Sequence, residues 1–143
     1  DGQVLDYAKI SAGSTVLKTN EVFTFCYFKY MDSFKKFEAH VLEQIENCRQ
    51  PESRLDDQDH NLGQVHYSVI PWVHFRGLSH PRNYGNGDSI PKIVFGKYTS
   101  SNGSTTMPVS VEAHHSLMDG FHMGQYFEGF QSCADHPEGT LGD

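Results

Sequence analysis

The chain has 143 residues, of which 37% are hydrophobic and 13% aromatic, a composition that supports one domain with an apolar core and is too short for two. Its formal charge of −7, without a run of Lys or Arg, argues against a nucleic-acid partner, because such affinity comes largely from cation contacts with phosphate. No apolar stretch approaches the roughly 20 residues that span a bilayer, so a soluble protein with no membrane partner is expected.

The N-terminal part predicts two strands and a helix. Asp1-Gly2 is typical of a hairpin turn, and residues 3–7 after it alternate as a strand does, so a partner strand is expected upstream of residue 1. Residues 22–30 are rich in β-branched and aromatic side chains and predict a second strand. Asp32 or Ser33 can cap the helix that follows. Apolar residues recur on one face of that helix: Phe34, Phe37, Val41, Leu42, Ile45 and Cys48.

The middle of the chain alternates between loops and a strand. Residues 49–63 are polar, with a proline and an acidic cluster, and predict a solvated surface loop. A strand is expected over residues 66–70, where Pro71 breaks it, and it can resume over residues 72–75. Residues 76–88 are dense in Gly, Pro and Asn and predict a second loop.

The C-terminal part predicts a hairpin and a helix. Strands are expected over residues 92–98 and 105–113, since the Asn-Gly pair at 102–103 is a hairpin signal. A final amphipathic helix is expected over residues 120–130, with a stripe of phenylalanines in the core. The order of elements predicts an α+β fold, a two-layer sandwich in which α-helices pack on a mostly antiparallel β-sheet.

The three cysteines, Cys26, Cys48 and Cys133, are odd in number and form no C-x-x-C pair. A disulfide framework or a zinc site is therefore a poor fit, and buried reduced thiols are expected. This usage favours a cytoplasmic location.

The most reactive group of side chains lies between the last predicted strand and the last predicted helix. There His114-His115 is followed by Asp119 and His122. We predict that His115 is a general base, because only imidazole takes and returns protons near neutral pH without a perturbed pKa. The spacing of His115, Asp119 and His122 would also suit three metal ligands on a helix, but Gly120 interrupts that helix and no second cluster completes a site. His114 is expected to be a packed or hydrogen-bonded neighbour, and His122 to be structural.

Three motifs carry a family resemblance over nearly the whole chain: HHxxxDGFH at residues 114–122 with Gln131 downstream, SxxPWxxF at residues 68–75, and Gly-Lys-Tyr at residues 96–98. Together they resemble the type-A chloramphenicol acetyltransferases. The HHxxxDG core alone is shared with dihydrolipoyl acyltransferase cores and peptide-synthetase condensation domains. Because the family's chains begin well before the turn that Asp1-Gly2 matches, residues 1–143 resemble a single acyltransferase domain that lacks its N-terminal part.

The resemblance implies acetyl transfer from acetyl-CoA, a co-substrate, to the 3-hydroxyl of chloramphenicol in a ternary complex, without a metal. His115 would take the proton of the acceptor hydroxyl, and Ser68 would donate a hydrogen bond to the tetrahedral oxyanion. Asp119 matches a structural carboxylate that pairs with an arginine of the missing N-terminal part. Trp72 and Tyr98 match positions that line the coenzyme side. Family members are homotrimers with active sites between subunits, so a monomer would be inactive.

Three departures from the family pattern concern the acceptor. Met118 replaces a usual cysteine, which is a volume-tolerant change. Val94 stands where a threonine is common, and Leu78 stands where an aromatic residue often contributes to the acceptor pocket. Acetyl transfer stays credible, but the acceptor is left open.

Other interpretations compete with each assignment. Ser68 alone is an ordinary strand serine, and Trp72 alone is more often core than a ligand platform. Three function classes follow: an antibiotic O-acetyltransferase, a related coenzyme-A-dependent acyltransferase that accepts another alcohol or a lipoyl thiol, and a truncated, non-catalytic domain that forms trimers. No role is assigned to the five remaining histidines: His60, His66, His74, His80 and His136.

Overall fold

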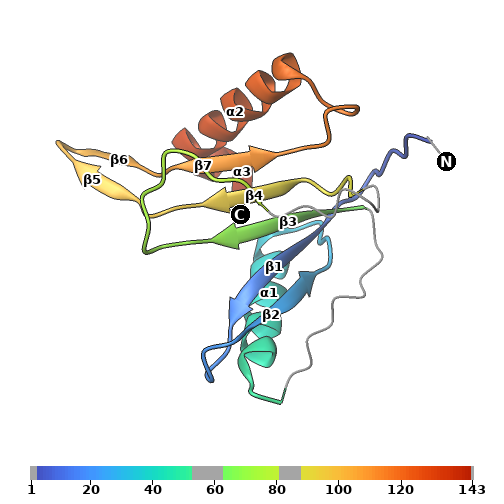
Figure 1. Cartoon of the computed structure of the whole chain (residues 1–143), viewed down its shortest axis with the longest axis vertical. Coiled ribbons are helices and arrows are strands. Elements are labelled where there is room, and N and C mark those ends of the chain that lie inside the picture. Colours follow the sequence, from blue (N-terminus) through green and yellow to red (C-terminus); the bar gives the residue numbers. More distant parts are fainter. Residues whose placement is uncertain (1–2, 53–62, 81–87, 143) are drawn as a thin grey trace.

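A computed structural model describes residues 3–52, 63–80 and 88–142 (Figure 1). The Asp1-Gly2 turn, most of the loop predicted over residues 49–63 and part of that predicted over residues 76–88 lie outside the described residues. The elements in chain order are β1 (Ser11–Leu17), β2 (Phe23–Phe28), α1 (Phe34–Arg49), β3 (Gln64–Val69), β4 (Lys92–Phe95), β5 (Thr99–Ser101), β6 (Ser104–Thr106), β7 (Val109–Glu112), α2 (Gly120–Asp135) and α3 (Pro137–Leu141).

Five strands form one sheet in the order β2-β1-β3-β4-β7, and β5 and β6 form a separate two-stranded sheet. β1 pairs in parallel with β3, and β3 with β4, whereas the β1–β2, β4–β7 and β5–β6 pairs are antiparallel. The parallel β1–β3 pair needs a long connection, which β2 and α1 provide. The predicted α+β class is confirmed, with antiparallel pairs in the majority.

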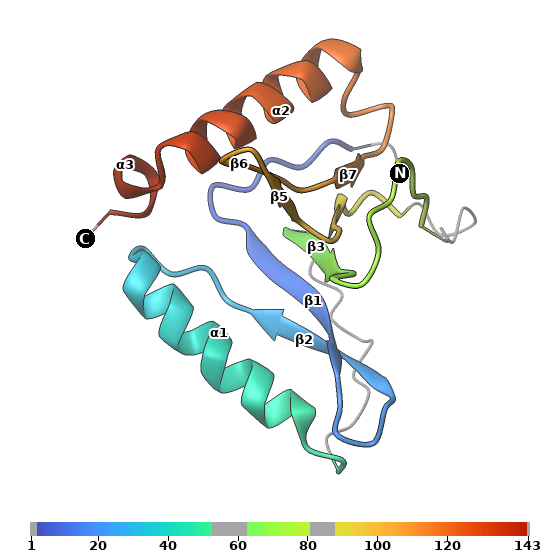
Figure 2. The same ribbon diagram turned by 90° about the vertical axis from the view of Figure 1, so that its left-hand side faces the viewer.

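Both long helices lie on the same side of the large sheet, so the structure has two layers (Figure 2). Under α1, the core consists of Val16, Cys26 and Phe28, against which Phe37, Val41, Ile45 and Cys48 of the helix pack. These helix residues recur at the predicted helical spacing, and burying their apolar surface is what binds α1 to β1 and β2. The predicted strand over 22–30 and the helix after it are therefore confirmed. Ser33 occupies the N-cap position, although its side chain makes no capping hydrogen bond.

The phenylalanine stripe of α2 is the main error in the predicted core. Phe130 stacks on Phe95 with 5.9 Å between ring centroids, but Phe121 is 71% exposed and Phe127 is 41% exposed. The reason is orientation, because the less exposed positions of α2 are Met123, Tyr126 and Phe130, which recur on one face of the helix towards the sheet. Phe121 and Phe127 fall outside this face.

The strand predicted over residues 3–7 is absent, and the structure has β1 over residues 11–17 instead. This strand lies inside the sheet between β2 and β3. Its small and polar residues hide it from a search for apolar alternation, yet they suit its position. At Gly13 an added Cβ would lie 3.2 Å from the ring of Tyr27, so glycine leaves room for that ring to lie across the strand.

The two predicted C-terminal strands are interrupted. β4 ends at Phe95, before the end of the strand expected over 92–98, and β5 begins only at Thr99, whereas β6 and β7 together replace the strand expected over 105–113. Pro108, between β6 and β7, has no N–H to donate to a neighbouring strand. Its carbonyl accepts a hydrogen bond from the N–H of Gly96, between β4 and β5 (2.9 Å), so the two interruptions lie opposite each other. The predicted turn is confirmed, because Asn102 and Gly103 both have positive φ, of 52° and 78°.

Strand β3 confirms the prediction over residues 66–70, but residues 72–75 do not resume it. The Val73 N–H instead donates to the Ile70 carbonyl (3.3 Å), which closes a turn, and the Lys97 N–H donates to the Val73 carbonyl (2.8 Å). Helix α2 runs five residues past its predicted end, and α3 was not predicted. Within the described part of the chain, no helix combines the length and the apolar character needed to cross a bilayer.

Two leucine-sized residues of α1 provide a test of this packing. Replacing Ile45, which packs on the core, with alanine should lower the free energy of unfolding by about 2 kcal/mol, because a methyl-lined void remains. The matched change Leu42→Ala, at a side chain that is 62% exposed, should cost under about 0.5 kcal/mol. Urea titrations followed by circular dichroism would measure both. Equal losses would contradict the orientation of α1.

Candidate active site

His115 lies in the loop between β7 and α2, which hydrogen bonds hold in a tight turn. The N–H groups of Leu117 and Met118 donate to the His114 carbonyl at 2.9 and 3.2 Å. The Ser116 N–H donates to Nδ1 of His114 (3.3 Å), so His114 is the hydrogen-bonded neighbour that was predicted.

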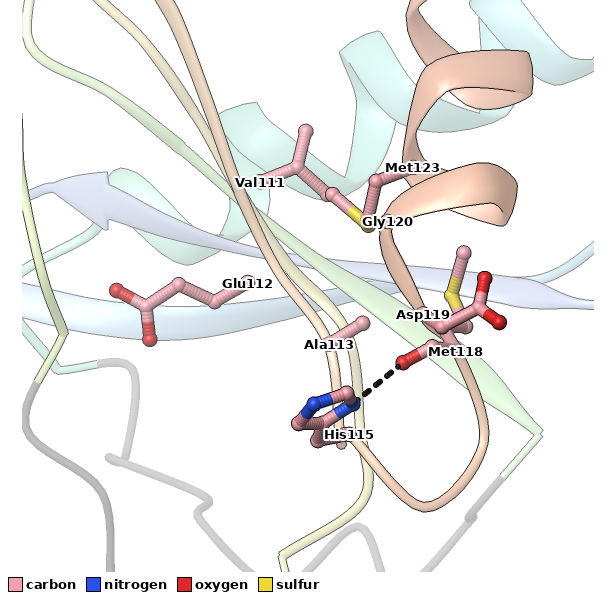
Figure 3. Close-up of a pocket in the computed structure, with 8 residues that line it drawn as sticks. All are labelled: Val111, Glu112, Ala113, His115, Met118, Asp119, Gly120 and Met123. Atoms are coloured by element: carbon pink, nitrogen blue, oxygen red, sulfur yellow. Dashed lines mark hydrogen bonds between the residues drawn. The ribbon is translucent and has the colours of Figure 1, made fainter.

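The ring of His115 is oriented by a backbone carbonyl. Its Nδ1 lies 3.1 Å from the carbonyl oxygen of Met118 (Figure 3). Because a carbonyl can only accept, Nδ1 carries the proton in this contact and Nε2 keeps its lone pair. The loop therefore selects the tautomer in which Nε2 can accept a proton.

A cavity of about 350 Å³ adjoins this histidine. Its walls come from the end of β7, the loop and the first turn of α2, with these residues lining it: Val111, Glu112, Ala113, His115, Met118, Asp119, Gly120 and Met123. The carboxylate of Glu112 points away from His115 (Figure 3), and its Oε1 accepts from the His80 N–H (2.6 Å). The chemistry of the cavity therefore rests on the imidazole.

Asp119 is the N-cap of α2. Its Oδ1 accepts from the N–H groups of Phe121 (3.0 Å) and His122 (3.2 Å). The same oxygen lies 2.7 Å from Nδ1 of His122. The His122 N–H lowers the pKa of this carboxyl most, and the His122 side chain lowers it further, while desolvation opposes the shift. Asp119 thus holds the beginning of α2, and through it the end of the histidine loop.

His122 has the structural role that was predicted. Its Nδ1 also lies 3.4 Å from the Asp119 N–H, in the arrangement of a capping box. One ring nitrogen cannot accept and donate at once, so the shorter contact decides that Nδ1 donates to the carboxylate. Among the described residues, no three His, Cys, Asp or Glu side chains are placed to hold a metal ion.

Ser68 lies on the other face of the sheet. Its neighbour Tyr67 faces the helix layer, where it stacks with Phe95, so Ser68 points the opposite way. The hydroxyl of Ser68 lies 3.4 Å from that of Thr15, and Val94 is its register partner on β4. Val94 is only 1% exposed. Val94, at the position where the resembled family commonly has a threonine, therefore lies directly beside Ser68.

Trp72 and Tyr98 lie near each other in the fold, after the ends of β3 and β4. The Lys97 N–H donates to the Val73 carbonyl (2.8 Å), and the Lys97 carbonyl lies 3.4 Å from Nδ1 of His74. These contacts bind the two segments together. Trp72 is 72% exposed and Tyr98 67%, so neither is core and both rings are available to a ligand.

The structure brings together only part of the predicted site. His115 and Asp119 line one cavity, on the helix side of the sheet, at the edge where β7 ends and β3 and β4 begin. Ser68, Trp72 and Tyr98 lie on the opposite face or at the opposite edge. Leu78 belongs to neither group, and its carbonyl accepts from the Ser110 hydroxyl (3.2 Å). In one chain, His115 and Ser68 therefore cannot flank the same reacting atom.

One functional group was missed by sequence reasoning. The carbonyl of Met118 orients the catalytic candidate, but backbone atoms leave no residue-type signal. The only hint in the sequence is the short spacing between His115 and Gly120, which forces a turn that brings a carbonyl back to the ring.

Comparisons with known proteins give the chain's family. The family model for chloramphenicol acetyltransferase matches residues 2–131. A chloramphenicol acetyltransferase of Clostridium perfringens is 30% identical over 128 residues, 88% of this chain and 58% of the relative. One of Vibrio anguillarum is 25% identical, covering 100% of this chain and 67% of the relative. The chain thus spans little more than half of the first of these relatives.

Two solved structures share the fold. A chloramphenicol acetyltransferase superposes with a TM-score of 0.70 at 22% identity, over 85% of this chain and 60% of the other. A dihydrolipoamide acetyltransferase of Azotobacter vinelandii also superposes with a TM-score of 0.70, at 12% identity, over 98% of this chain and 59% of the other.

The capping role of Asp119 has a pH signature. Because its pKa is lowered in the folded state, the stability it contributes is present above the unfolded pKa and is lost as pH falls through the folded value. Asp119→Asn should lower Tm by a few degrees at pH 7, and the difference from the parent should shrink as the pH is lowered below 3.8, the ordinary pKa of the group. The control Asp32→Asn removes an exposed pair with Lys9 and should change Tm little at either pH. A pH-independent difference for Asp119→Asn would contradict the assignment.

Proposed function

We propose that this chain, which belongs to the chloramphenicol acetyltransferase family, transfers acetyl from acetyl-CoA to the 3-hydroxyl of chloramphenicol with His115 as general base. The observation that carries the proposal is the contact between Nδ1 of His115 and the Met118 carbonyl, which leaves Nε2 as a proton acceptor beside a cavity. The relatives' shared name supports chloramphenicol as the acceptor.

The reaction runs through one tetrahedral intermediate. Nε2 of His115 takes the acceptor's hydroxyl proton as the oxygen attacks the thioester carbonyl. The intermediate then collapses, its C–S bond breaks, and the thiolate of coenzyme A receives the proton from the imidazolium. No acyl-enzyme forms and no metal is required, because proton transfer and charge stabilisation suffice.

Ser68 donates a hydrogen bond to the oxyanion of this intermediate. The role suits a strand residue whose backbone is held on both sides, since such donors act by being fixed before charge develops. In a solved structure with this fold, the dihydrolipoamide acetyltransferase of A. vinelandii, the role of a serine, a histidine and an asparagine in the catalytic mechanism has been investigated.

The two halves of the site come from different copies of the chain. Within one chain, Ser68 and His115 lie on different faces of the sheet, so a site that needs both requires a second subunit. The family resemblance implies three copies, and a closed ring of three, each facing its neighbour in the same way, repeats this contact without an unpaired surface. Such a homotrimer has three complete sites, and an isolated monomer is inactive.

The coenzyme and acceptor use the remaining groups. The exposed rings of Trp72 and Tyr98 offer apolar faces to the coenzyme, and an adenine ring stacks on Tyr98. Asp119 acts through the loop, as a positioning residue. Val94 removes a hydroxyl beside Ser68, and Leu78 offers no aromatic ring, so another hydroxyl or thiol acceptor is the second candidate. That candidate is favoured by Val94, because it changes the surroundings of the oxyanion donor.

Removing the base should abolish the reaction. In the complete protein, His115→Ala should eliminate the thiol release from acetyl-CoA that depends on chloramphenicol, and Ser68→Ala should lower kcat by about 10²–10³-fold. His136→Ala, which removes an exposed histidine beside α3, should leave the rate unchanged. The same assay with a panel of alcohols and a lipoyl thiol separates the two candidate acceptors. Undiminished turnover in His115→Ala would refute the mechanism, and a folded protein inert to every acceptor would favour a non-catalytic domain.

A mixing experiment tests whether the site is shared. Protein that carries His115→Ala and protein that carries Ser68→Ala are each nearly inactive, but co-refolding equal amounts should restore about one quarter of the parent activity. An active site needs an intact His115 from one subunit and an intact Ser68 from its neighbour. Each of these is present with a chance of one half, so one site in four is complete. Mixing two samples of His115→Ala is the control. No recovery in mixed assemblies, verified by mass, would place both residues of a site in one chain.

A further inference from the structure

Two cysteines meet where α1 packs on β2. Sγ of Cys48, in the last turn of α1, lies 2.8 Å from Sγ of Cys26 on β2. Both are reduced thiols in the structure, as is Cys133. Cys26 is buried with 1% exposure, Cys48 is half-buried, and Cys133 is exposed, contrary to the expectation of a buried thiol.

The contact is held from both sides. Cys26 lies between Val16 and Phe28 in the core, and Cys48 packs on this cluster. Just beyond Cys48, the Arg49 carbonyl accepts from the Thr19 N–H (3.2 Å), which ties the end of α1 to the β1–β2 turn. The two sulfurs are therefore presented to each other by packed elements.

We propose that Cys26 and Cys48 form an oxidisable dithiol that closes to a disulfide and covalently joins α1 to β2. A disulfide bond is about 2.05 Å long, so the sulfurs need to approach by only about 0.75 Å from their present separation. A shift of this size lies within the range of side-chain torsions and leaves the helix in place.

The oxidant is a small disulfide such as oxidised glutathione. The thiolate of Cys48 attacks one of its sulfurs, so a mixed disulfide forms and one glutathione leaves. Cys26 sulfur then attacks the Cys48 sulfur, the mixed bond breaks, and the second glutathione leaves with the proton from Cys26. Two thiols are oxidised while one glutathione disulfide is reduced to two thiols.

The difference in burial sets the order of these steps. Burial, helped by the contact with Cys48, raises the pKa of Cys26 to about 12, so the first attack does not start from this sulfur. The half-buried Cys48 is the one that a solvent-borne oxidant reaches. Cys26 then acts as the resolving thiol, because it already touches Cys48.

Closing the bond restricts the unfolded chain. The cross-link joins residues 22 positions apart and encloses the end of β2, the connection after it and nearly all of α1, and a loop of this size should raise Tm by roughly 5–10 °C. The device is independent of acetyl transfer, because neither cysteine lines the His115 cavity.

The test starts from Cys133→Ser, so that an exposed thiol cannot join two chains. Purified protein is incubated with oxidised glutathione, blocked with an alkylating reagent and analysed by intact mass and peptide mapping. We expect a mass lower by two hydrogen atoms, a linked peptide pair that contains Cys26 and Cys48, and a higher Tm that a reductant reverses. A Cys48→Ala variant should show neither the mass loss nor the rise in Tm.

Two results would overturn the proposal. In the first, the folded Cys133→Ser protein is exposed to oxidising conditions that convert a model dithiol peptide to its disulfide. If the protein is then unfolded and both of its cysteines are still fully alkylated, no disulfide has formed. In the second, Cys48 stops at the mixed disulfide with glutathione. Because peptide mapping is done on a protein with both native core cysteines, the test does not depend on whether Cys48→Ala folds.

Discussion

β4 pairs in parallel with β3 on one side and antiparallel with β7 on the other, and these two pairings decide where each proposed functional group leaves the sheet. Its residues Ile93 and Val94 are 3% and 1% exposed, so the strand is fixed by burial on both faces. Because β7 runs against β3 and β4, its end delivers the histidine loop to the edge opposite Trp72 and Tyr98. A change of register in β4 would therefore displace both halves of the site.

The same pairing underlies the proposal that one chain presents half-sites. Successive residues of a strand face opposite ways, so Tyr67 joins the aromatic stack beneath α2 and its neighbour Ser68 is turned to the other face. His115 lies in the loop that leads from β7 into α2, and it lines a cavity on the helix side. The sheet itself therefore stands between the proposed base and the proposed oxyanion donor, which makes a second copy a chemical requirement of the mechanism.

The sequence predicted correctly those elements whose signals lie within a few neighbouring residues. Helical periodicity found α1, and the asparagine-glycine pair found the β5–β6 turn, because both signals lie within a few residues. β1 was missed because its glycine and serines are explained only by the ring of Tyr27 and by strands on both sides of it. The resemblance inferred from three motifs is confirmed by the family match, but spacing along the chain says nothing of which face of a sheet Ser68 occupies.

In the histidine loop, the group that orients the His115 ring is different from the groups that hold the beginning of α2. Asp119 is engaged with the N-terminus of α2 and with His122, so its charge serves the helix rather than the imidazole of His115. The ring is oriented by the Met118 carbonyl, which cannot take up the proton from Nδ1 and adds no net charge beside it. A carboxylate in that position would stabilise the imidazolium and so make it a weaker acid towards the leaving thiolate. A neutral carbonyl held in a tight turn avoids this effect, but it requires a rigid loop, and the Asp119 cap of α2 at the loop's end provides that rigidity.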